Sequence, residues 1–391
     1  MNEITNANSK KIILMGAGAS APAGIPTAKS MFEKIYEAID QEAHYKKILA
    51  PTINLAIAGI KFHHSTVFQD PFHEVDIEEL YETLITLHNR TNDPLSPFVG
   101  SWSSEVLSVS NIQLDDQVDY LTHTLKESLE TSLNNSSRDG ARRAADINLI
   151  GFKRALKDTL NSINGKPSGV FKDAASFLLF KLNSLVWVTD DSKVEYITPL
   201  IASSHSKPIW IASLNYDNVI ELACEKAGIH CDVGIENDKN GLKFKPDSPV
   251  SLAKLHGSVN WLIGDDLRVE IQKEPINSAA VIFGAGNKLK ASGPYLDLLL
   301  AFRDELNGSD ELEIFGYSFR DAHINHIILT WFSQNQNSKI HVIDKYLTEN
   351  QILKNLNSAL EHPQSIYRPA ISGRIHLENL GIQEWIEREY A

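Results

Sequence analysis

The segment KIILMGAGASAPAGIP, residues 11–26, decides the fold class. Residues 11–15 form a short apolar run with two isoleucines, which is typical of a strand buried in a parallel sheet. Small residues follow this run, and residues 31–39 then repeat apolar side chains at helical spacing. The segment therefore predicts a buried strand, a tight turn and a helix.

The same strand pattern recurs further along the chain. Apolar runs occupy residues 208–215, 279–284, 311–318 and 339–345, and a helical pattern follows most of them. Alternation of strand and helix is typical of helices wound onto both faces of a parallel sheet. The chain is therefore predicted to have an α/β fold with a Rossmann-like, doubly wound parallel sheet.

A long interval separates the first two of these strands. It spans about 190 residues, far more than a simple connection needs. Residues 77–87 and 114–133 repeat apolar side chains at helical spacing, so the inserted segment is predicted to be helical. We expect a sheet domain made of residues 1–60 and 196–391, with a large helical insertion at residues 61–195.

Composition restricts the partners and the compartment. The chain has 391 residues, with 37 basic and 50 acidic side chains and a formal charge of −13. This charge disfavours direct binding of nucleic acid or of an anionic membrane. The polar N-terminus resembles no secretion signal, and no uncharged apolar run reaches about 18 residues, so we expect a soluble, cytoplasmic protein.

The two cysteines, Cys224 and Cys231, cannot fill a four-thiolate zinc site and are expected to be reduced, buried thiols.

The turn after the first strand has the spacing of a phosphate-binding loop. Gly16, Gly18 and Ala21 fit the pattern G-x-G-x-x-[GA], in which small residues let backbone N–H groups approach a pyrophosphate. A tight turn without a ligand is the alternative. A dehydrogenase would place an acidic residue at the end of a second strand about 20 positions later. Here Glu37 and Asp40 lie within a helical pattern, so hydride transfer is disfavoured, and no P-loop lysine follows the turn.

Further motifs occur in the order found in sirtuins, and together they resemble that family. They are GAGAS with GIP (16–26), SLNYD (213–217), KLHGS (254–258), VIFGAGNK (281–288), FGYSFRDAHIN (315–325) and HVIDK (341–345). The spellings LNYD, LHGS and GYSFRDAHIN are closer to bacterial sirtuin-like effectors of phage defence than to protein deacylases. The fold implied by the resemblance is again Rossmann-like.

One departure from the deacylases bears on the reaction. Deacylases carry a zinc ribbon with two cysteine pairs after the histidine motif, whereas only 26 residues and no cysteine lie between His256 and Phe283. We therefore expect no zinc ribbon and no metal. The resemblance then implies an NAD⁺ glycohydrolase that cleaves NAD⁺ to nicotinamide and ADP-ribose, with NAD as its substrate.

Three residues are the catalytic candidates by this resemblance. Asn215 would hydrogen-bond the nicotinamide ribose or the attacking water, and Asp217 would orient it. His256 would accept a proton from a ribose hydroxyl or from water. The structural alternatives are a turn-forming asparagine and a core histidine at a strand end.

The resemblance also implies a set of residues that contact the dinucleotide. They are Gly16, Ala17, Gly18, Ser20, Pro26, Gly284, Gly316, Ser318 and Asp344. Ser20 and Ser318 lack the G-x-S-x-G context of a nucleophile, so binding is expected, with a helix or turn cap as the alternative. Asp344 follows a strand, where it would meet the adenosine ribose.

A dense group of polar residues in the insertion is a weaker candidate for a site. It comprises His63, His64, Asp70, His73, Asp76 and Glu78. These residues have no H-E-x-x-H spacing, so metal binding is disfavoured. By the resemblance, Asp76 and Glu78 are minor candidates for a place near the NAD pocket.

Uncontrolled NAD⁺ cleavage would kill the host cell, which indicates how such an enzyme is used. We expect a toxic effector of anti-phage defence that causes abortive infection by NAD depletion. The resemblance implies a homo-oligomer and a separate partner, either a HerA-type DNA translocase or an Argonaute-like protein. The alternatives are a non-hydrolysing NAD or ADP-ribose-binding regulatory subunit and, less favoured, an NAD-dependent protein deacylase or an ADP-ribosyltransferase. Linear and cyclic ADP-ribose both stay open as products.

Overall fold

The computed structural model describes residues 10–41, 49–67, 70, 74–89, 169–235, 242–264, 268–276, 281, 294–358 and 373–390. The chain folds into two compact units. We call Met1–Met31 with Leu179–Ala391 the sheet unit, and Phe32–Leu178 the helical unit. The domain limits expected above, at residues 60/61 and 195/196, stay a prediction.

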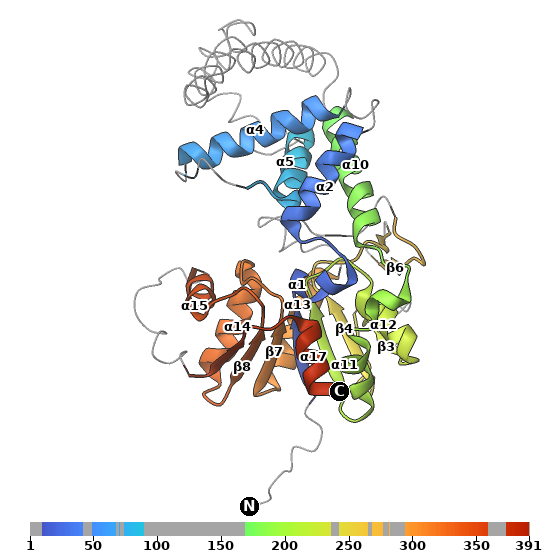
Figure 1. Cartoon of the computed structure of the whole chain (residues 1–391), viewed down its shortest axis with the longest axis vertical. Coiled ribbons are helices and arrows are strands. Elements are labelled where there is room, and N and C mark those ends of the chain that lie inside the picture. The colour runs from blue at the N-terminus through green and yellow to red at the C-terminus, as the bar shows by residue number, and fades with distance from the viewer. Residues whose placement is uncertain are drawn as a thin grey trace, which may run out of the picture. The chain divides into compact units, whose positions relative to one another are not determined.

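A seven-stranded sheet forms the centre of the sheet unit, and every strand pair in it is parallel (Figure 1). Its order is β3-β4-β2-β1-β7-β8-β9. The strands are β1 (Lys11–Met15), β2 (Ile209–Ser213), β3 (Cys231–Asp232), β4 (Val250–Lys254), β7 (Glu311–Phe315), β8 (Lys339–Ile343) and β9 (Ile375–Glu378). A separate antiparallel pair joins β5 (Trp261–Ile263) to β6 (Val269–Ile271). The predicted α/β, Rossmann-like fold with a parallel sheet is confirmed.

The first strand lies where the direction of winding reverses. β1 pairs with β2 on one side and with β7 on the other, so Met15 is in register with both Ser213 and Phe315. Open parallel sheets bind ligands outside the carboxyl ends of their strands at such a reversal. The carboxyl edge beside β1 is therefore where a site is expected.

Helices cover both faces of this sheet. They are α1 (Ala17–Ser20), α11 (Thr198–Ala202), α12 (Val219–Ala227), α13 (Tyr295–Asn307), α14 (Ala322–Gln334), α15 (Glu349–Ser358) and α17 (Ile382–Tyr390), with 3₁₀ turns η1 (Ala21–Ala23), η2 (Asp191–Val194) and η3 (Ser203–His205). On one face, side chains of α13 and α14 join Leu14 and Trp210 in a single buried cluster. On the other face, Trp385 of α17 packs edge-on against Phe315, with ring centroids 5.1 Å apart. Both faces are thus buried, which explains the uninterrupted apolar runs.

The helical unit contains α4 (Ala50–Val67) and α5 (Ile77–Asn89). Two further helices, α2 (Ala28–Gln41) and α10 (Gly169–Val186), cross the limits between the units. The helix predicted over residues 77–87 is confirmed by α5, whereas residues 114–133 lie outside the described residues.

The structure contains features that the sequence patterns do not predict. The strands β3, β4 and β9 have no counterpart among the predicted strands, and residues 279–284 lie outside the described residues except for Val281. Cys224 is buried as expected, but Cys231 is only partly buried, and both are free thiols.

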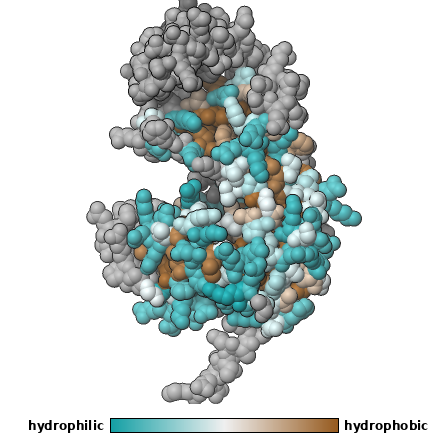
Figure 2. Space-filling view, viewed as in Figure 1, coloured by the Kyte–Doolittle hydropathy of each residue, from teal (hydrophilic) through white to brown (hydrophobic). Residues whose placement is uncertain are grey.

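Within the described part of the chain, every helix is too short or too polar to cross a membrane. Figure 2 shows mainly hydrophilic side chains over the visible face of the sheet unit.

Candidate functional site

Four loops meet at the carboxyl edge of the sheet, and they carry four of the motifs. They follow β1, β2, β4 and β7, whose last residues are in register with one another. We call residues 16–20, 214–218, 255–258 and 316–321 the strand-end site. The parallel register thus brings together segments that lie up to about 300 residues apart in the sequence.

The glycines of the first loop pack directly on the fourth. Gly16 N–H donates to the Phe315 carbonyl at 2.9 Å, and Gly18 N–H donates to the Gly316 carbonyl at 3.0 Å. A Cβ atom on Gly16 would lie 2.5 Å from the Gly316 oxygen, and one on Gly18 would lie 2.7 Å from the Gly316 Cα. Contact between two backbones therefore requires these glycines, whether or not a ligand binds there.

Asn215 connects the first loop to the second. Its amide Nδ2 donates to the Gly16 carbonyl and to Ser20 Oγ, both at 2.9 Å. Ser20 is buried, and its hydroxyl is hydrogen-bonded to the Asp217 carboxylate as well. Ser20, predicted to contact the dinucleotide, thus joins the two catalytic candidates of the second loop.

Asp217 is buried beneath this loop. Its Oδ1 accepts the Val219 N–H at 3.0 Å, and its main-chain carbonyl accepts a hydrogen bond from Lys254 Nζ. Lys254 is itself buried and forms an ion pair with Glu221 Oε1 at 3.0 Å. Burial raises the pKa of the Asp217 carboxyl, although Lys254 opposes this shift.

Replacement of Asp217 by asparagine is expected to change how stability depends on pH. Because the folded-state pKa lies above the ordinary value of 3.8, folding favours the protonated carboxyl. Wild-type stability should therefore fall as pH rises from about 4 through the folded-state pKa, relative to Asp217→Asn, which has no carboxyl to ionise. Urea unfolding of both proteins at several pH values measures this difference. A difference that does not grow with pH would contradict it.

His256 is paired with Asp321, a residue that the motif resemblance does not single out. Its Nε2 lies 3.0 Å from Asp321 Oδ2, and both side chains are buried. The other carboxylate oxygen, Oδ1, caps α14 by accepting the N–H groups of His323 at 3.0 Å and Ile324 at 3.4 Å. An aspartate just before a helical pattern is a cap signal, but this pairing with His256 depends on the tertiary fold.

The remaining predicted residues lie in varied surroundings. Ala17 is exposed in α1 and Pro26 is buried between η1 and α2, while Gly284 lies outside the described residues. Ser318 is exposed, and its carbonyl accepts from Asn355 Nδ2 at 3.0 Å. Asp344 follows β8, and its Oδ1 accepts the N–H groups of Tyr346 and Leu347 at 2.8 and 2.9 Å, closing a turn.

The minor candidates of the insertion lie in the helical unit. Asp76 Oδ1 accepts the Glu79 N–H at 2.9 Å at the start of α5. His64 Nε2 lies 2.8 Å from Glu79 Oε1, and His73 lies outside the described residues. Its hydrogen bond with the Glu79 N–H gives Asp76 the role of a helix cap.

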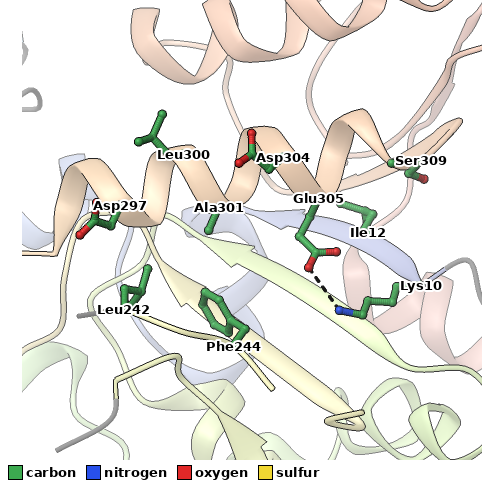
Figure 3. A pocket seen from close by; sticks show the side chains of 11 residues that line it. Lys10, Ile12, Leu242, Phe244, Asp297, Leu300, Ala301, Asp304, Glu305 and Ser309 are labelled. Carbon is green, nitrogen blue, oxygen red and sulfur yellow. Dashed lines mark hydrogen bonds and ion pairs between the residues drawn. The ribbon is translucent and has the colours of Figure 1, made fainter. Parts of the chain in front are cut away.

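A cavity of about 660 Å³ lies beside the start of β1, not at the strand-end site (Figure 3). Ile12, Leu242 and Phe244 line it together with α13. Lys10 Nζ and Glu305 Oε1 pair at 3.2 Å in its wall. It includes none of the predicted site residues, so its size alone does not identify the functional site.

Comparison with known proteins gives a family match that overlaps part of the strand-end site in sequence. None of the curated proteins compared with the chain matches it. Residues 210–362 match the family described as the SIR2-like domain, a span that includes Asn215, Asp217 and His256. The first loop, with Gly16 and Ser20, precedes the matched span. Members of this family act on NAD⁺, so the match over residues 210–362 supports an NAD-related activity.

Proposed function

We propose that the chain is an NAD⁺ glycohydrolase that cleaves NAD⁺ to nicotinamide and ADP-ribose. The observation that carries the proposal is the equivalent placement of Asn215 and His256 at the carboxyl edge. Ser213 of β2 is in register with Lys254 of β4, and each candidate follows two residues after that pair. Two neighbouring loops thus present an amide and an imidazole at the edge where a doubly wound sheet binds ligands.

His256 has the chemistry of a general base in this arrangement. The Asp321 carboxylate accepts the proton on Nε2, which leaves the lone pair of the ring on Nδ1. Cleavage of the nicotinamide–ribose bond gives the sugar oxocarbenium character, and water must then add to it. We assign to His256 the acceptance of a proton from that water or from a ribose hydroxyl.

Asn215 has a narrower role than its residue type alone implies. Its Nδ2 already donates to Gly16 and Ser20. The group it offers to a substrate is therefore the carbonyl oxygen Oδ1, which accepts hydrogen bonds. A ribose hydroxyl or the attacking water is the fitting donor. Asp217, linked through Ser20, holds this amide in place.

We propose further that this reaction serves bacterial anti-phage defence by NAD depletion, that is, by abortive infection. Constitutive cleavage would exhaust the cell's own NAD⁺, so the activity needs control. The resemblance of LNYD, LHGS and GYSFRDAHIN to defence effectors supports control by homo-oligomerisation and by a HerA-type or Argonaute-like partner.

The test is a chromatographic assay of NAD⁺ products with the purified full-length chain. Incubation should release nicotinamide and ADP-ribose, and linear and cyclic products separate in the same run. Addition of lysate from phage-infected cells should increase the rate if a trigger or partner is required. Binding of NAD⁺ without turnover under all conditions would overturn the proposal and favour a regulatory binding subunit. An acyl-lysine peptide in a parallel reaction should stay intact.

A further inference from the structure

Two histidines and a glutamate lie together on the last two strands of the sheet. His341 of β8 is in register with His376 of β9, and Ile343 is in register with Glu378. Alternate residues of a strand point to the same face, so the three side chains share one face of the sheet. Glu378 Oε1 lies 2.7 Å from His341 Nε2 and 3.8 Å from His376 Nε2. The three candidate ligand atoms all lie within 4.8 Å of one another.

We propose that His341, His376 and Glu378 bind a divalent transition-metal ion, with Zn²⁺ the best fit to the ligand set. Two imidazoles and one carboxylate are ligands that zinc accepts, with water in the fourth position. Bonds of about 2.1 Å in a tetrahedral site place ligand atoms about 3.4 Å apart. The observed separations bracket this value, so small rotations of the side chains suffice.

Arg388 holds the Glu378 carboxylate in position in the absence of a metal ion. Arg388 Nη1 of α17 lies 2.6 Å from Glu378 Oε2. Arg388 thus engages one carboxylate oxygen, while the other faces the imidazoles.

The two histidines differ in how freely their side chains can rotate. The His341 side chain is partly buried, and its ring lies edge-on to Trp385 with centroids 6.1 Å apart. The His376 side chain is 71% exposed and can rotate toward the ion. His341 and Glu378 are thus already in contact without a metal ion, and His376 supplies the third ligand.

A hollow adjoins the two histidines of the cluster. A hollow of about 450 Å³ is lined by both His341 and His376. The exposed His376 side chain gives a metal ion access to the cluster from solvent. A bound ion would tie β9, the edge strand, to β8.

The sequence alone gives no indication of this cluster. His341 and His376 are 35 positions apart and fit no metal-binding spacing. Only the parallel register of β8 and β9 brings them together. The cluster is separate from the strand-end site, so this inference does not depend on the proposed function.

The test is a calorimetric titration of Zn²⁺ into the chelator-treated full-length chain. Wild type should bind one equivalent more than the double variant His341→Ala/His376→Ala. At about 100-fold excess of zinc over Kd, the wild-type melting temperature should rise by about 4 °C. The matched control, His205→Ala, removes an exposed histidine of η3 and should keep the wild-type stoichiometry.

Two milder variants keep the test decisive if the double variant folds poorly. His376→Ala removes a largely exposed ring, and Glu378→Gln keeps the shape of the side chain while removing its charge. Each should weaken zinc binding by at least about 10-fold. Equal zinc affinity and stoichiometry in wild type and in both variants would overturn the proposal, as would absence of binding to wild type at micromolar zinc.

Discussion

His256→Ala is expected to lower the rate of NAD⁺ cleavage by about 100- to 10,000-fold, the range that general acid–base catalysis contributes. The substitution removes the proposed base and its contact with the buried Asp321 carboxylate. Initial rates of nicotinamide release at saturating NAD⁺ measure the loss. Asn215→Ala should also be severely impaired, because it removes the acceptor for ribose or water.

The companion variant Asp321→Asn tests whether Asp321 orients His256 for catalysis, apart from its role in stabilising α14. Asparagine caps helices as well as aspartate does, so α14 should keep its N-terminus and the protein its stability. The carboxylate that selects the His256 tautomer is nevertheless lost. We expect kcat to fall at least about 10-fold with little change in KM. His205→Ala serves as the unaffected control, and full turnover by His256→Ala would refute the assignment of the base.

Gly316→Ala is expected to destabilise the sheet unit by about 2 to 4 kcal/mol and to disrupt the first loop. The added Cβ would lie 2.4 Å from both Ala19 N and Gly18 C. Both are backbone atoms, so no side-chain rotation relieves the overlap. The residue also has a φ of +59°, in the left-handed region that favours glycine. Urea unfolding followed by circular dichroism measures the change.

Gly228→Ala is the matched control for this experiment. Gly228 ends α12 with a φ of +65°, close to that of Gly316. No atom of the described residues lies within 4 Å of the position of its added Cβ. The variant Gly228→Ala should therefore lose only the free energy needed to hold alanine at a positive φ, about 1 kcal/mol. The difference between the two variants isolates the steric overlap of the two loops. Equal losses of stability would mean that the first loop moves aside without cost.

The fold is predictable where a strand lies within a run of mainly apolar residues. β1, β2, β7 and β8 each have five residues and lie within apolar runs that the sequence displays directly. β4 is harder to predict because its apolar pattern is broken by Ser251 and ends in the buried Lys254. β3 has only two residues, and β9 is an edge strand whose sequence IHLE alternates apolar and polar side chains. Propensity gives little signal for such segments.

For the strand-end site, the sequence indicates which residues take part better than it indicates which residues they contact. Motif order indicates Asn215 and His256, and the parallel register explains why they lie on neighbouring loops. The spacing of Gly16 and Gly18 is the same for phosphate binding and for packing against Gly316, so sequence alone does not separate the two. The pairing of His256 with Asp321 depends on β4 and β7 ending at one edge, which no local pattern encodes.

The buried Lys254 links the end of β4 to the Asp217 loop and to α12. It is the last residue of β4, directly before the His256 loop, and its ammonium group binds the Asp217 carbonyl and the Glu221 side chain of α12. Opening of the Asp217 loop would break the hydrogen bond from the buried ammonium group to the Asp217 carbonyl and leave it with the Glu221 ion pair, which is unfavourable. Lys254 therefore resists movement of the Asp217 loop away from the end of β4, which helps to hold the amide of Asn215 at a fixed spacing from the strand that precedes His256.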